Sequence, residues 1–129
     1  MYNMKELTKA EEQIMQILWK INKGFVNDIL EEFPLPKPAY NTVSTIVRIL
    51  EKKEFVSHKA YGKTHEYFPL ISKEEYTKTY LKGFMSNYFS NSYQQLVSFF
   101  SNDNNLSVKE LEEIREMMEQ QIEKQKNQA

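Results

Sequence analysis

The residues with the clearest chemistry in this chain lie in residues 36–53, PKPAYNTVSTIVRILEKK. One side of this stretch, read at helical spacing, carries short hydrogen-bonding and basic side chains, and its first acidic residue is Glu51. Such side chains let a helix approach and hydrogen-bond the base edges of a major groove. An ordinary amphipathic helix with a solvated face is the alternative. The candidate groove-facing residues are Asn41, Thr42, Ser44, Thr45, Arg48 and Lys52.

The two histidines form a second set of reactive side chains. His58 and His65 fall on paired strands of a predicted hairpin, with Glu66 adjacent, and could come close together. Neighbouring residues of a strand point to opposite faces, so His65 and Glu66 do not converge on one metal ion. We therefore expect solvated histidines and no metal site. The chain has no cysteine, which excludes disulfides, thiolate metal sites and cysteine nucleophiles. No catalytic or cofactor-binding motif is present, so we predict neither enzymatic activity nor a cofactor.

The elements around residues 36–53 predict a helix-turn-helix. The apolar residues Val43, Ile46, Val47 and Leu50 predict a buried stripe, and the prolines before them favour a helix beginning near residue 40 and ending near 53. A capping box at Thr8 to Glu11 opens an earlier helix at about 8–21, which we expect to end at Gly24. A short helix at about 27–33 lies between them. The buried stripe of the first helix is Ala10, Ile14, Ile17, Leu18 and Ile21, with Trp19 in the core.

A β-hairpin is predicted directly after this helix pair. Residues 55–61 and 64–68 alternate with a period of two, and Gly62-Lys63 between them supplies a residue that tolerates positive φ. Pro69 closes the second strand. A hairpin in this position is typical of a winged helix-turn-helix, whose wing lies along the phosphate backbone. The candidate wing contacts are Lys59, Tyr61 and Lys63.

Residues 72–129 form a different region, without strand signals. We expect helices at about 72–89, at about 93–100 and from 107 onward. Their apolar surface exceeds what they can cover on each other, which predicts a dimer. The alternative is that they fold back onto the N-terminal lobe. The fold class is therefore mainly α with a small β-hairpin, divided into a winged-helix domain at 1–71 and dimerisation helices at 72–129. The candidate dimerisation residues are Tyr80, Phe84, Tyr88, Leu96, Phe100, Leu111, Ile114 and Met118.

Composition and charge fit this division. The chain of 129 residues is 40% hydrophobic and has a formal net charge of −1. Residues 36–69 hold six basic against three acidic side chains, whereas residues 71–129 hold seven against nine. A basic middle suits one phosphate-facing surface on an acidic body. No apolar run is long enough to cross a membrane and no secretion signal opens the chain, so we predict a cytoplasmic protein.

Near-neutral net charge leaves one other function open: a winged helix used for protein contacts, with the C-terminal helices as the main interface. Binding to duplex DNA that weakens steeply with salt would favour a DNA-binding protein, because each neutralised phosphate releases counterions. A protein-docking module would bind duplex DNA weakly at any salt concentration.

Four stretches resemble the BlaI/MecI/CopY, or penicillinase-repressor, family of bacterial repressors. They are LTKAEEQIMQILWK (7–20), YNTVSTIVRILEKKEFV (40–56), YGKTHEYFPLISKEEY (61–76) and SYQQLVSFF with LSVKELEEI (92–114). The resemblance implies a dimer of winged helices that binds a dyad-symmetric DNA operator and represses transcription. It assigns the DNA-facing positions to Asn41, Thr42, Ser44, Thr45 and Arg48, with Asn41 standing where family members often have lysine.

The resemblance also implies a mode of induction. In the antibiotic-resistance members, a membrane-bound sensor metalloprotease leads to cleavage between the dimerisation helices. The corresponding bond here is Phe99–Phe100, with phenylalanine where asparagine is usual before the bond. The copper-responsive members carry cysteine metal ligands, which this chain lacks.

Overall fold

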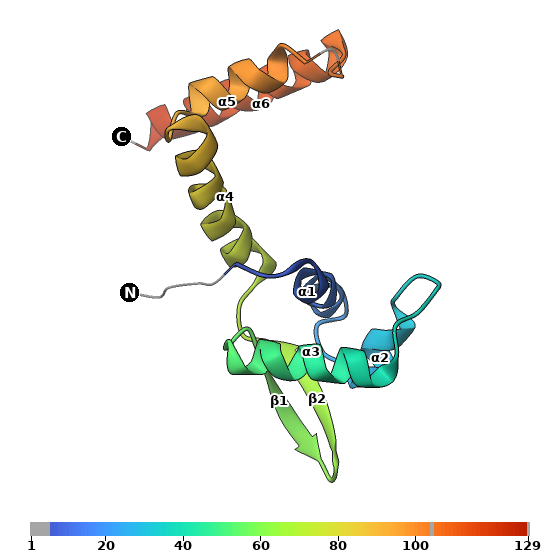
Figure 1. The fold of residues 1–129 in the computed structure, drawn as a ribbon. Coiled ribbons are helices and arrows are strands. Elements are labelled where there is room, and N and C mark those ends of the chain that lie inside the picture. Colours follow the sequence, from blue (N-terminus) through green and yellow to red (C-terminus); the bar gives the residue numbers. More distant parts are fainter. Residues whose placement is uncertain (1–5, 104, 129) are drawn as a thin grey trace. The chain divides into compact units, whose positions relative to one another are not determined.

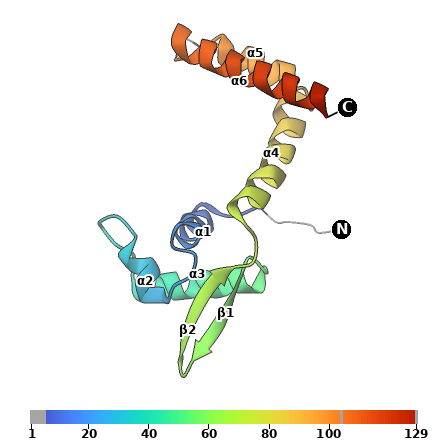
Figure 2. The ribbon, with the colours of Figure 1, turned by 180° about the vertical axis from the view of Figure 1, so that it is seen from behind.

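The computed structural model describes residues 6–103 and 105–128, and the chain divides into two compact units between Leu81 and Lys82. Figures 1 and 2 show the order of the elements. The first unit contains three helices, a two-stranded hairpin and the start of α4, and the second contains the rest. The elements are α1 (Lys9–Ile21), α2 (Val26–Glu31), α3 (Tyr40–Lys52), β1 (Val56–Tyr61), β2 (Thr64–Pro69), α4 (Lys73–Phe89), α5 (Tyr93–Ser101) and α6 (Val108–Asn127).

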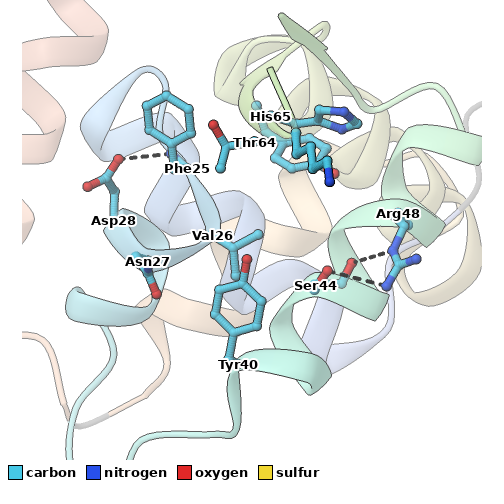
Figure 3. Close-up of a pocket in the computed structure, with 11 residues that line it drawn as sticks. Phe25, Val26, Asn27, Asp28, Tyr40, Ser44, Arg48, Thr64 and His65 are labelled. Atoms are coloured by element: carbon cyan, nitrogen blue, oxygen red, sulfur yellow. Dashed lines mark hydrogen bonds between the residues drawn. The ribbon is translucent and has the colours of Figure 1, made fainter. Parts of the chain in front are cut away.

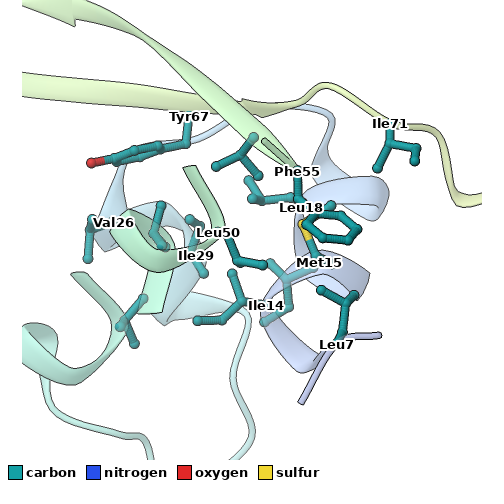
Figure 4. Packing of buried hydrophobic residues seen from close by; sticks show 14 of the residues in the cluster. Leu7, Ile14, Met15, Leu18, Val26, Ile29, Leu50, Phe55, Tyr67 and Ile71 are labelled. Carbon is teal, nitrogen blue, oxygen red and sulfur yellow. The ribbon is translucent and has the colours of Figure 1, made fainter. Parts of the chain in front are cut away.

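The core of the first unit lies where α1, α2 and α3 pack against the base of the hairpin (Figure 4). The stripe predicted for α3 is buried at Val43, Val47 and Leu50, while Ile46 is half-buried against the core. The α1 stripe is buried except at its ends, where Ala10 is exposed and Ile21 half-buried. The remaining members of the buried cluster are Leu7, Ile14, Met15, Ile17, Leu18, Val26, Ile29, Phe33, Phe55, Val56, Tyr67, Ile71 and Tyr76.

The first turn of α4 belongs to this core. Tyr76 is buried, its ring centroid lies 5.9 Å from that of Trp19, and its hydroxyl accepts a hydrogen bond of 3.2 Å from the Leu7 amide. Trp19 Nε1 donates to the Ile71 carbonyl at 2.9 Å. The first unit therefore extends beyond residue 71, where the sequence predicts a domain boundary, because an aromatic side chain of α4 is needed to cover α1.

The end of α1 differs from the prediction. Asn22, with a positive φ of 73°, ends the helix two residues before Gly24, and its backbone N–H donates to the Leu18 carbonyl. Gly24 instead forms a two-hydrogen-bond bridge with Tyr67 of β2, at 2.8 and 2.9 Å. A Cβ at Gly24 would lie 2.9 Å from Ile21 Cδ1 and 3.1 Å from Asp28 Cβ, so a larger residue there would require the Ile21 side chain to shift.

The hairpin follows the prediction closely. Strands β1 and β2 are antiparallel, with His58 opposite Tyr67 and Lys59 opposite Glu66. Gly62 has a φ of 64°, as its place in the two-residue turn requires. Figures 1 and 2 show the hairpin projecting beyond α3 with its turn at the far end. Because side chains alternate along a strand, His58, His65 and Tyr67 share one face and Lys59, Tyr61 and Glu66 share the other.

The second unit consists of the end of α4 with α5 and α6. Ser90 and Asn91 adopt left-handed conformations (φ of 50° and 63°) and separate α4 from α5 where the sequence predicts a break. Phe89 of α4 packs against Phe99 of α5, with ring centroids 5.7 Å apart. Helices α5 and α6 run alongside each other in both views. Within residues 6–103 and 105–128, the helices are too short or too polar to cross a membrane.

The predicted dimerisation residues lie on surfaces that the single chain leaves partly or wholly open. Tyr80, Tyr88 and Met118 are exposed. The others, each half-buried, are Phe84, Leu96, Phe100, Leu111 and Ile114. No residue of α5 or α6 is fully buried.

Candidate nucleic-acid interface

The solvent-facing side of α3 carries a line of polar side chains. Asn41, Thr45, Arg48 and Lys52 are spaced by three or four residues, so they lie above one another on one face, and all four are exposed. Thr42 is exposed beside this line. A helix of 13 residues is about 20 Å long, which is enough to follow a major groove over several base pairs.

Arg48 is oriented by Ser44, which is half-buried one turn earlier on α3. The Arg48 Nη2 group donates to Ser44 Oγ at 3.3 Å, and Nε donates to the Ser44 carbonyl at 3.4 Å (Figure 3). A guanidinium has five N–H donors, so these two bonds leave others available to an acceptor. Of the predicted groove-facing residues, Ser44 is therefore placed to act through Arg48.

The predicted wing contacts lie at and near the turn of the hairpin. Lys59, Tyr61 and Lys63 are all exposed, and Lys59 Nζ lies over the Tyr61 ring, 5.3 Å from its centroid. Glu66 stands directly across the sheet from Lys59 and weakens the positive potential there. Lys63 lies in the turn itself, outside the paired strand positions, and so is not directly opposite that carboxylate.

A groove of about 590 Å³ joins the two predicted contact regions (Figure 3). It carries the basic side chains of Arg48 and Lys63. The carboxylate of Asp28 accepts a 2.9 Å hydrogen bond from the Phe25 amide and so caps the start of α2. The lining residues are Phe25, Val26, Asn27, Asp28, Tyr40, Ser44, Arg48, Lys63, Thr64, His65 and Tyr67.

The pKa of Tyr67, on β2, is influenced by charged side chains of α3. Burial raises the pKa of its phenol, and the negative charge of Glu51 raises it further, while the positive charge of Arg48 acts in the opposite direction. The net pKa of Tyr67 is raised, so its hydroxyl is protonated at neutral pH. The charges of Glu51 and Arg48 therefore both influence the pKa of this one side chain.

The two histidines do come together. Their rings are stacked, with centroids 4.0 Å apart and planes 7° from parallel, and Tyr67 packs beside both. His58 Nδ1 lies 2.5 Å from Glu51 Oε2 on α3. Glu66 faces the other side of the sheet, as the alternation predicts. Among the described residues, no group of three or more His, Cys, Asp or Glu side chains could hold a metal ion.

Sequence reasoning missed Tyr40 and Glu51. Tyr40 begins α3 and lines the groove, and Glu51 binds His58 across the helix–hairpin interface. The sequence spacing of Ser44, Arg48 and Glu51 could have predicted that these side chains lie on adjoining turns of α3. The pairing of Glu51 with His58 could not be predicted from the sequence, because it depends on where the hairpin packs.

The comparison with protein families shows to which family the chain belongs. The family model described as "Penicillinase repressor" matches residues 7–120. The chain belongs to the penicillinase repressor family. It is a DNA-binding transcriptional repressor with a winged helix, and members of the family are not enzymes. This confirms the resemblance, the fold class and the general function expected from the sequence.

Relatives of this penicillinase repressor family member match over most of its length. It is 28% identical over 114 residues to "Methicillin resistance regulatory protein MecI" of Staphylococcus aureus, covering 88% of this chain and 93% of the relative. It is 22% identical over 121 residues to "Penicillinase repressor" of Bacillus licheniformis, covering 93% and 94%. The solution structure of the DNA-binding domain of the repressor BlaI is similar, with a TM-score of 0.50 and 25% identity, covering 59% of this chain and 94% of that domain.

Proposed function

We propose that this repressor works as a homodimer that binds a dyad-symmetric operator, with α3 of each protomer in the major groove of one half-site. The observation that carries the proposal is the exposed line of Asn41, Thr45, Arg48 and Lys52 on α3. A two-fold protein dimer matches a two-fold operator, so each protomer would make the same contacts.

The chemistry of these side chains divides them into two roles. Asn41 suits adenine, Arg48 suits guanine through O6 and N7, and the methyl group of Thr45 suits thymine. Lys52 at the end of α3 and Lys63 in the wing suit phosphate oxygens, which provide affinity and register. The remaining candidate contacts are Thr42 on α3 and Lys59 and Tyr61 on the hairpin, and Ser44 contributes by orienting Arg48.

The exposed apolar side chains of the second unit support dimerisation there. Phe99 of α5 is 68% exposed, and on α6 Met117 is 63%, Met118 54% and Ile122 53% exposed. Large apolar side chains left in water on neighbouring helices favour burial against a second copy. The dimer interface in this proposal comprises Tyr80, Phe84, Tyr88, Leu96, Phe100, Leu111, Ile114 and Met118.

We further propose inactivation by cleavage of the Phe99–Phe100 bond, downstream of a membrane-bound sensor metalloprotease, in the cytoplasm where the operator is located. The bond lies in the last turn of α5, where Asn102 N–H donates to the Ser98 carbonyl at 3.2 Å. A protease binds its substrate extended, so this turn must open first. Mass spectrometry of the repressor from induced cells should give fragments 1–99 and 100–129. Intact repressor alone in fully induced cells would contradict this step.

Footprinting on the protein's own upstream DNA tests the central proposal. We expect protection of two half-sites related by a dyad, and affinity that falls steeply with salt at about 0.9 in log–log slope per neutralised phosphate. Equal affinity for that DNA and for random duplex at low salt would overturn the operator assignment. Protection of one half-site by a monomer would overturn the homodimer.

A further inference from the structure

The Arg48 guanidinium has an acidic neighbour on its own helix. Glu51 follows Arg48 by three residues on α3, a spacing at which an acidic and a basic side chain meet and attract each other. Arg48 and Tyr67 both line the groove, and Tyr67 packs beside His58, the residue that Glu51 contacts. If Glu51 turned to Arg48, it would occupy the guanidinium and set a carboxylate against the DNA phosphates.

Glu51 is held by the hairpin instead. Its Oε2 lies 2.5 Å from His58 Nδ1 on β1, and each side chain is 30% exposed. Within residues 6–103 and 105–128, there is no ion pair between Glu51 and Arg48, and Arg48 donates to Ser44 on the preceding turn. The two neighbours on α3 are thus directed to different partners.

The position of the His58 ring is defined by its surroundings. It stacks on His65 at 4.0 Å and packs against Tyr67 at 5.7 Å, between centroids. The backbone pairing of His58 with Tyr67 fixes the strand that carries it. A ring packed against two aromatic neighbours has already lost part of its rotational freedom, so the hydrogen bond to Glu51 costs less side-chain entropy.

We propose that His58 is a positioning residue for DNA binding: it holds Glu51 against the hairpin and so leaves the Arg48 guanidinium for the operator. The inference rests on the proposed contact between Arg48 and DNA. His58 itself does not need to touch DNA. Its effect on affinity requires both Glu51 and Arg48, which distinguishes it from a residue that only stabilises the fold.

The test is a mutant cycle on the full-length repressor, with binding to a labelled duplex of its own upstream region measured by fluorescence anisotropy. His58→Phe keeps the ring packing but cannot bond to Glu51. We expect it to weaken binding roughly two- to fivefold, the range for one exposed ion pair gained by Arg48, and to lower the salt slope by about one. His58→Phe/Glu51→Gln should return to wild-type affinity. His58→Phe should have no effect in an Arg48→Ala background.

The outcomes separate this inference from the proposed function. Unchanged affinity of His58→Phe, or failure of Glu51→Gln to restore it, would overturn the positioning role while wild-type operator binding stands. If the wild type shows no preference for the upstream duplex, the proposed operator contact fails instead. His58→Gln keeps an N–H donor toward Glu51 and should bind more tightly than His58→Phe. If His58→Phe has a lower melting temperature than the wild type, the single variant Glu51→Gln becomes the test. Its affinity for the duplex should match or exceed that of the wild type, and a lower affinity would overturn the proposal.

Discussion

Lys53 Nζ lies 2.8 Å from Glu11 Oε2 and joins the end of α3 to the first turn of α1. The Glu11 side chain is 6% exposed and that of Lys53 25%. The same carboxylate accepts a 2.9 Å hydrogen bond from the Thr8 amide in the capping box. One buried carboxylate therefore both caps the start of α1 and anchors the C-terminus of α3.

Glu11 makes the stability of the first unit depend on acid pH. Burial acts to raise its pKa, but the hydrogen bonds and charge of Lys53 and the bonds from Thr8 outweigh burial, and the net pKa lies below its ordinary value of 4.5. A carboxyl group whose pKa is lowered by folding stabilises the protein above its unfolded pKa, and this contribution is lost as pH falls through the folded pKa. Glu11→Gln should cost about 1–3 kcal/mol at pH 7 and progressively less below pH 4.5.

The measurement is urea unfolding followed by the fluorescence of Trp19, the only tryptophan, which lies in the first unit. Glu12 is the next residue in the chain and is exposed, so Glu12→Gln is the matched control. It should change the free energy of unfolding little, both at pH 7 and at acid pH. A difference between Glu11→Gln and wild type that stays constant down to pH 3 would contradict the assigned pKa shift.

Arg48→Ala should weaken binding to the operator by about 1–3 kcal/mol and relax the preference for it over random duplex. The side chain bonds only to Ser44 among the described residues and is exposed, so the melting temperature should hardly change. Anisotropy titrations with both duplexes measure the effect. The control is Arg115→Ala, at an exposed arginine of α6. A parallel fall in thermal stability would mean that Arg48 is structural.

Lys63→Ala should lower affinity for operator and random duplex by the same factor, because a turn lysine contacts phosphate rather than bases. The slope of log affinity against log salt should fall by about one. Salt titrations with both duplexes test this, with Lys23→Ala, exposed in the loop after α1, as the control. A selective loss for the operator would instead give Lys63 a role in base recognition.

Leu111→Asp and Ile114→Asp should dissociate the proposed dimer and sharply reduce operator affinity. Both residues are half-buried within the single chain, so these variants also strain the second unit itself. Met118→Asp is the cleaner test, because Met118 is 54% exposed and its replacement should disturb the fold of the single chain less. Sedimentation velocity measures the oligomeric state, and Gln121→Asp, an exposed polar position on α6, is the control. If Met118→Asp forms a dimer with the same dissociation constant as the wild type, the interface does not include Met118 and must lie elsewhere.

The sequence by itself determined the elements whose signals are local. Helical spacing at Val43, Val47 and Leu50 predicted α3, and the alternation around Gly62 predicted the hairpin and the face that each histidine occupies. The capping box at Thr8 predicted the start of α1. Each signal depends on residues within about one turn or one strand pair, so no knowledge of packing was needed.

Only the tertiary structure decided which distant side chains meet. Glu11 and Lys53 are 42 positions apart, and Gly24 pairs with Tyr67 rather than ending α1. Tyr76 brings the start of α4 into the first unit, and Glu51 turns to His58 rather than to its helical neighbour Arg48. These contacts depend on how helices and hairpin pack around one buried core, and periodicity along the chain carries no information on that packing.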